Sequence, residues 1–126
     1  MIHYLDTQVT VWLCQRQLER IPRRAQAAIE ESDILLSPIV LLELQYLYEI
    51  KKISQPSQLL FNQLASQIGA RLCDYSFGAV VQTALFETWT HDPFDRLIVA
   101  HAKANGYAPL ITSDADIRKH YSGSVW

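Results

Sequence analysis

The chain has 126 residues, of which 49% are hydrophobic and 19% are charged, and its formal net charge at pH 7 is −2. This composition is typical of a single globular domain, residues 1–126, and excludes a disordered or low-complexity protein. The most apolar run, residues 34–44, is too short to cross a bilayer and is interrupted by Glu43, so no membrane segment is expected.

Apolar, β-prone runs alternate with amphipathic stretches along the chain. Local signals mark several helix ends: Ser37-Pro38 and Asp92-Pro93 are typical helix starts, and Gly69 and Asn105-Gly106 are typical stops. The pattern predicts strands at residues 2–5, 33–37, 71–75, 109–112 and 125–126, and helices at 7–13, 22–30, 39–51, 54–69, 76–89, 93–105 and 115–120. This order predicts an α/β domain of three layers (α/β/α), with helices on both faces of a mostly parallel central sheet.

The cysteines and the N-terminus indicate the expected compartment. Cys14 and Cys73 lie among apolar neighbours without metal-type spacing, which favours free, buried thiols in a reducing cytosol. The first residues lack a basic region and a long apolar core, so no signal peptide is expected. We therefore expect a cytoplasmic protein.

The cations fall into small groups, and the small net charge argues neither for nor against nucleic acid as a partner. These groups admit two interpretations: ordinary solvated helix faces, or a broken basic rim around an acidic centre. Their members are Arg16, Arg20, Arg23 and Arg24, then Lys51 and Lys52, then Arg118 and Lys119.

Two acidic residues lie at or just beyond the ends of predicted strands. Asp6 ends the first strand, and Asp114 follows the strand at residues 109–112 by two positions. Each has a plain interpretation as a helix cap. Both would also lie at the carboxyl edge of a parallel sheet, which is where such sheets bind ligands.

Two further acids lie on predicted helices. Glu43 has apolar helical neighbours, where a carboxylate is costly unless it is paired or bound to metal. Asp95 is the third residue of the helix that begins at Asp92-Pro93, and capping with a favourable dipole explains an acid there as well as metal binding does.

If these four carboxylates share a site, they need a cation. Carboxylates without partners repel one another and hold protons, and Arg96 is the only cation placed near them. Mg²⁺ or Mn²⁺ relieves this repulsion, because both prefer oxygen ligands. An all-oxygen metal site with bound water suits phosphodiester hydrolysis.

Four segments in this order and spacing resemble the PIN-domain nucleases, and within them the VapC-type toxins of bacterial toxin–antitoxin pairs. The segments are Leu5-Asp6-Thr7, Ser37-Pro38 with Leu42-Glu43-Leu44, residues 92–100, and residues 110–114. The resemblance spans essentially the whole chain. It implies a PIN-like five-stranded parallel sheet, Mg²⁺- or Mn²⁺-dependent endoribonuclease activity, a homodimer, and inhibition by a cognate antitoxin protein.

The resemblance also implies roles for individual residues. The residues that match the family's metal-binding, catalytic acids are Asp6, Glu43, Asp95 and Asp114. The accessory candidates are the hydroxyls of Thr7 and Thr112, with Asp92, Arg96 and Asp116 nearby. Asp116 also fits a cap of the short helix that follows it. A surplus of apolar residues on the early helices, namely Trp12, Leu44, Leu47 and Tyr48, adds to the expectation of a dimer.

Other functions remain open at this point. A phosphotransfer receiver-like or phosphatase domain also clusters acids at strand ends, but no late strand here ends in Lys. A serine hydrolase fits poorly, because no Gly-x-Ser-x-Gly motif is present. The alternative from another class is a non-catalytic PIN-like module that binds RNA or protein, and metal-dependent RNA cleavage distinguishes it from an enzyme.

Overall fold

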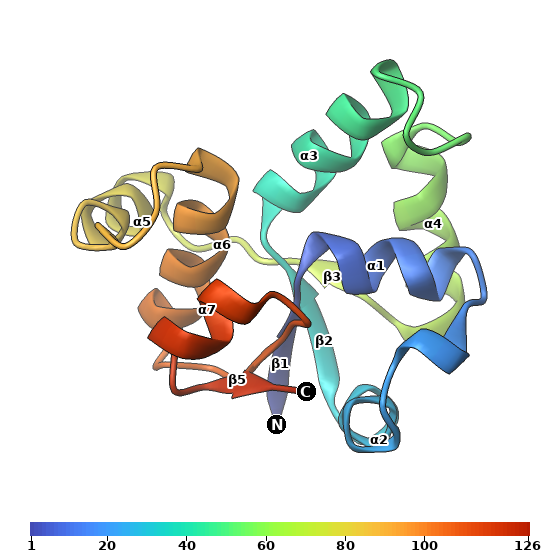
Figure 1. Ribbon diagram of the computed structural model, residues 1–126, viewed down its shortest axis with the longest axis horizontal. Helices are drawn as coiled ribbons and strands as arrows, with labels where there is room; N and C mark the ends of the chain where they lie inside the picture. Colours follow the sequence, from blue (N-terminus) through green and yellow to red (C-terminus); the bar gives the residue numbers. More distant parts are fainter.

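In the computed structural model, which describes residues 1–126, a five-stranded sheet lies between helices (Figure 1). The strands are β1 (Ile2–Leu5), β2 (Asp33–Leu36), β3 (Arg71–Leu72), β4 (Leu110–Ile111) and β5 (Ser124–Val125). The α-helices are α1 (Thr7–Cys14), α2 (Arg23–Glu31), α3 (Pro38–Glu49), α4 (Ser57–Ile68), α5 (Phe77–Ala84), α6 (Pro93–Ala104) and α7 (Ala115–His120), with one 3₁₀ turn, η1 (Leu18–Arg20).

All five strands are parallel, in the order β3-β2-β1-β4-β5. The chain moves outward from β1 to β2 and β3, then returns to build β4 and β5 on the other side of β1. The strand order therefore reverses between β1 and β4. In parallel sheets, the crevice outside the carboxyl ends at such a switch point is the usual place for a ligand.

Alternate side chains of the central strands enter two separate cores, as expected for a sheet buried on both faces. Tyr4, Leu35 and Leu110 face one core, which α3, α6 and α7 complete. Leu5 and Ile111 face the other, which α1, α2 and α4 complete. Figure 1 shows the resulting layers, with α5, α6 and α7 on one side of the strands and α1, α2 and α4 on the other. The three-layer α/β/α prediction is confirmed.

Local chemistry sets several helix ends as the sequence predicts. Ser37 caps α3 by accepting from the Ile39 N–H, and Pro38 is its first residue. Gly69 ends α4 in the left-handed conformation, with φ at 68°. The boundaries of α7 match those predicted.

Three predictions about local structure are wrong in detail. Helix α5 ends at Ala84 rather than at residue 89, and Glu87, beyond its end, pairs with Lys103 of α6. Strand β3 has two residues rather than five. Cys14 is free but only half-buried, whereas Cys73 is free and buried.

The apolar residues that suggested a dimer are also mostly not exposed. Leu44 is fully buried, and Trp12 packs against Trp126 with ring centroids 5.9 Å apart. Exposed apolar side chains occur at several places, among them Tyr48, and they include Leu42 on α3, which is 58% exposed, and Phe77 on α5, which is 69% exposed. None of the helices has both the length and the apolar character that a membrane span requires.

Candidate metal centre

The switch point between β1 and β4 brings two of the predicted acids to one edge of the sheet. Asp6 follows β1 directly, and Asp114 follows β4 after Thr112 and one further residue. Each also caps a helix: Asp6 Oδ1 accepts from the Thr7 N–H at 2.8 Å, and Asp114 Oδ1 accepts from the Ile117 N–H at 2.9 Å. The capping interpretation is therefore correct for both residues, and the cap is what fixes each carboxylate at the sheet edge.

Two threonine hydroxyls donate hydrogen bonds to two of the carboxylates. The Thr112 hydroxyl donates to Asp6 Oδ2 at 2.6 Å, and the Thr7 hydroxyl donates to Glu43 Oε1 at 2.5 Å. Both threonines are buried, as is Asp6. The two hydroxyls thus connect β4 to α1 and α1 to α3, which places Glu43 beside the sheet edge.

The Asp92-Pro93-Phe94-Asp95 segment divides into a cap and an unpartnered acid. Asp92 Oδ1 accepts from the N–H groups of Phe94 and Asp95, at 2.8 and 3.4 Å. The Asp92 N–H is bound by the Thr90 hydroxyl, so Asp95 does not close a capping box. No protein group donates a hydrogen bond to the half-buried Asp95 carboxylate. The structure therefore removes capping as an explanation for Asp95 and leaves only the helix dipole as a local one.

Burial and mutual repulsion raise the pKa values of three acids. Burial is the largest cause of the raised pKa of Asp95, and together with the charges of Asp92, Asp6, Asp114 and Glu43, in that order, it brings this pKa to about 7. Burial is also the main cause of the raised pKa values of Asp6 and Glu43, where hydrogen bonds from the threonines act in the opposite direction. We call Asp6, Glu43, Asp95 and Asp114 the acidic cluster. Asp92 contributes to all three shifts, so its charge acts on this cluster.

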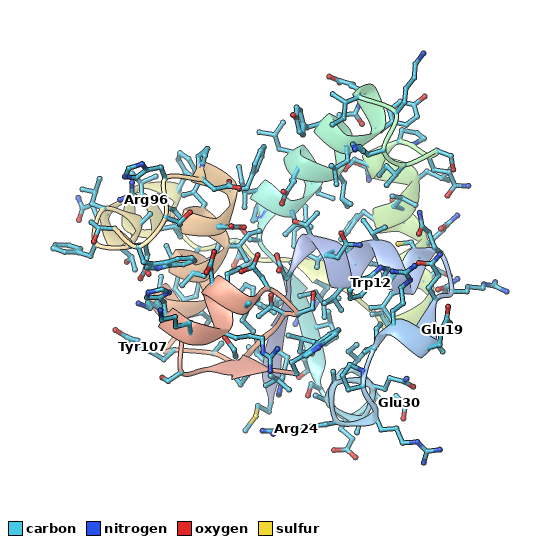
Figure 2. The ribbon with its side chains drawn as sticks, in the orientation of Figure 1. Trp12, Glu19, Arg24, Glu30, Arg96 and Tyr107 are labelled. Atoms are coloured by element: carbon cyan, nitrogen blue, oxygen red, sulfur yellow. The ribbon has the colours of Figure 1, made fainter.

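No basic side chain neutralises these acids. The one ion pair in the protein joins Lys103 to Glu87, and Lys103 lies in the last turn of α6, whereas Asp95 lies in the first. Arg96 instead donates to the Leu85 carbonyl at 3.4 Å and lies over α5 (Figure 2). Asp116 is exposed and is not among the charges that raise the pKa values of the cluster. The structure thus places Arg96 and Asp116 outside the cluster.

The acidic cluster is open. No three of its side chains come close enough together to enclose a single ion. Repulsion between carboxylates favours such separation when nothing neutralises them. The donor set of buried carboxylates and threonine hydroxyls, without a cation, is nevertheless the set that Mg²⁺ or Mn²⁺ prefers.

A buried hydrogen bond that the sequence does not reveal joins the two helices that carry Glu43 and Asp95. The Ser37 hydroxyl, at the start of α3, lies 2.8 Å from His101 Nδ1 on α6. Both side chains are buried, and burial lowers the pKa of His101, which favours the neutral ring. This contact fixes the distance between the two helices at the sheet edge. Ser37 was predicted as a cap only, and no local pattern identifies His101 as its partner.

The sequence matches the PIN domain family over residues 3–122. The chain belongs to the PIN domain family. It matches no curated protein sequence. As a PIN domain, it falls within a family of nucleases, and its four predicted acids occupy the carboxyl edge of the sheet.

Solved structures share the fold of this PIN domain. VapBC2 from Rickettsia felis, bound to a DNA fragment from its promoter, is 22% identical with a TM-score of 0.70, over 100% of both chains. VapBC-1 from nontypeable Haemophilus influenzae is 18% identical with a TM-score of 0.66, over 97% of this chain and 93% of that one. DNA-bound VapBC from Salmonella typhimurium is 20% identical with a TM-score of 0.59, over 95% and 90%. At these identities, the likeness establishes the fold.

The raised pKa of Asp95 predicts how Asp95→Asn affects stability without metal. A carboxyl group whose pKa is higher in the folded state destabilises the fold increasingly as pH rises from its unfolded value, near 4, through about 7. Asn resembles the neutral acid, so the variant should melt above the parent by a small amount at pH 5 and by a larger amount at pH 8. Thermal melts in EDTA at both pH values measure this difference.

A lower melting temperature for Asp95→Asn than for the parent would contradict this prediction. If Asp95 serves only the helix dipole, Asp95→Asn loses about 0.3–1 kcal/mol at neutral pH and melts lower than the parent. Asp116→Asn is a matched control, because Asp116 is also an acid in the first turn of a helix but is exposed. The control should show no gain in melting temperature at pH 8.

Proposed function

We propose that this PIN domain is a divalent-metal-dependent endoribonuclease, a hydrolase of RNA phosphodiester bonds. The observation that carries the proposal is the Asp95 carboxylate, which is half-buried among other acids with neither a hydrogen-bond donor nor a cation beside it. A group in this state is costly for the fold unless it binds something. The chemistry it matches is that of a hard divalent cation with oxygen ligands.

In this proposal the acids of the cluster have different roles. Asp6 and Glu43 are held in place by the hydroxyls of Thr112 and Thr7, so their free lone pairs keep a fixed direction. Asp114 is held by its cap on α7, and Asp95 remains free to move toward an ion. Asp6, Glu43, Asp95 and Asp114 would hold Mg²⁺ or Mn²⁺, which would polarise the phosphate and lower the pKa of the attacking water.

A role as the toxin of a toxin–antitoxin pair is also proposed. The four segments resemble VapC-type toxins, and the solved structures that share the fold are VapBC complexes. The partner would be a cognate antitoxin, and the site of action the cytoplasm, where the thiols of Cys14 and Cys73 stay reduced. An antitoxin segment that places an Arg against the cluster would neutralise it, because a guanidinium pairs well with carboxylates.

RNA cleavage by the purified protein tests the nuclease proposal. We expect cleavage with Mg²⁺ or Mn²⁺, less with Ca²⁺, and none in excess EDTA. Asp95→Asn should reduce the rate by about a hundredfold or more, the scale for loss of a main electrostatic stabiliser. A gel assay of labelled RNA measures these rates.

Asp92→Asn is the matched control, because Asn caps a helix about as well as Asp. It should reduce cleavage far less than Asp95→Asn. Equal cleavage in EDTA would contradict the role of the metal. Metal binding without any cleavage would favour the alternative, a non-catalytic module that binds RNA or protein.

Expression of the chain alone in a bacterial host tests the toxin proposal. We expect growth arrest, relieved by the antitoxin encoded beside it and absent with Asp95→Asn. The readout is growth after induction, with the amount of folded protein checked in parallel. Normal growth at high levels of folded parent protein would contradict the toxin role.

A homodimer is proposed on the exposed apolar face of α3 and α5. Leu42 and Phe77 border an apolar cavity of about 380 Å³ that a second copy could fill. Light scattering should give a dimer for the parent at tens of micromolar concentration. Phe77→Asp should give a folded monomer, whereas a parent monomer under these conditions would contradict the proposal.

A further inference from the structure

A basic groove lies between α2, α7 and the C-terminus. We call it the α7 groove, and its lining comprises Arg24, Ala115, Arg118, Lys119, Tyr121, Ser122, Ser124 and Trp126. Its volume is about 430 Å³. The lining includes three cations, two serine side chains and two aromatic rings, but no acid. The groove therefore offers hydrogen-bond donors and positive charge to whatever occupies it.

The three cations have no carboxylate partners. The one ion pair in the protein lies elsewhere, and all three side chains are exposed. Cations in the last turn of α7 are partly explained by the dipole of that helix. That explanation does not apply to Arg24, which comes from the first turn of α2 and converges on the same groove.

Aromatic side chains extend the groove toward α1. The Trp126 ring packs against the Trp12 ring with centroids 5.9 Å apart, and the Arg20 guanidinium lies 5.9 Å from the centroid of Trp12. Both indoles are half-buried, so part of each remains accessible. Figure 2 shows Trp12 on α1 and Arg24 on α2, on the same side of the molecule as the C-terminus. Cations alternating with aromatic rings are typical of surfaces that bind single-stranded nucleic acid.

The groove is connected to the acidic cluster by a single short helix. Asp114 caps the start of α7, and Arg118 and Lys119 lie in its last turn. The rise of an α-helix places these positions about 6–8 Å along the axis from the cap. Ala115, the residue after Asp114, also lines the groove, so the groove begins beside one of the acids.

We infer that the α7 groove, continued by Trp12 and Arg20, binds the phosphates of a single-stranded RNA substrate on its way to the acidic cluster. This inference rests on the proposed function, because it assigns the substrate path of the same site. The groove supplies attraction that the cluster cannot, since the carboxylates repel phosphate. An acidic protein segment matches the charge of the groove but makes no use of the aromatic rings.

Binding of RNA by a cleavage-deficient protein tests the inference. In the Asp95→Asn background with EDTA, fluorescence anisotropy measures the affinity for a fluorescein-labelled oligouridylate over a range of salt concentrations. The groove variant combines Arg24→Gln, Arg118→Gln and Lys119→Gln. Three lost phosphate contacts should weaken binding about tenfold or more and reduce the slope of log K against log salt by about 2, at ~0.7 per contact for single strands.

The matched control combines Lys51→Gln, Lys52→Gln and Arg71→Gln, which removes the same charge from the α3–α4 loop and β3. It should keep the salt slope of the Asp95→Asn parent. Equal losses in the two triple variants would overturn the inference, because they would reflect net charge alone. Unchanged binding in the groove variant would also overturn it, as would a poly-glutamate peptide that binds as tightly as RNA.

Catalysis provides a second readout that separates this inference from the proposed function. With Asp95 intact and metal present, the groove variant should hydrolyse bis(p-nitrophenyl) phosphate at the parent rate, because this small diester needs only the acidic cluster. Its KM for RNA should rise while its kcat changes little. If the parent hydrolyses neither substrate, the nuclease proposal fails, and the anisotropy comparison still decides whether the groove binds RNA.

Discussion

The burial of like charges at the switch point between β1 and β4 is the constraint on which the site depends. The sheet order brings Asp6 and Asp114 to one edge, and α3 and α6 add Glu43 and Asp95. The protein compensates this charge only in part, with two threonine hydroxyls and backbone N–H groups. Burial, together with the repulsion that remains, raises the pKa of Asp95 to about 7. These incompletely compensated charges lower the stability of the fold, which is typical of a functional site.

The acids differ in how much each one contributes to the fold. Asp6, Asp92 and Asp114 each cap a helix, so they position backbone as well as charge. Asp95 has no hydrogen-bond partner, which leaves its contribution to the fold unfavourable. The Ser37–His101 contact holds α3 against α6 and so keeps Glu43 and Asp95 at the same edge. Rigid elements thus hold Asp6, Glu43 and Asp114 in place, whereas the Asp95 side chain is free to move toward a ligand.

Much of this arrangement could be predicted from the sequence, because its signals are local. Helix starts such as Ser37-Pro38 and stops such as Gly69 act through neighbouring backbone groups, and the strand order of a parallel sheet brings strand-end acids together. The rest depends on contacts between distant residues. Glu87, beyond the early end of α5, pairs with Lys103, and Ser37 meets His101 across 64 positions. Arg96, a neighbour of Asp95 in sequence, donates to the Leu85 carbonyl rather than to an acid, because adjacent residues on a helix point in different directions.

The central claim is that the cluster holds protons that a metal displaces, and proton release on metal binding measures this directly. Mn²⁺ titrated into metal-free protein at pH 7, by calorimetry in two buffers of different ionisation enthalpy, gives the number of protons released. Asp95, with a pKa of about 7, should alone release about half a proton, and Asp95→Asn should release less and bind more weakly. Binding without proton release, or with the same release in Asp95→Asn, would contradict the account.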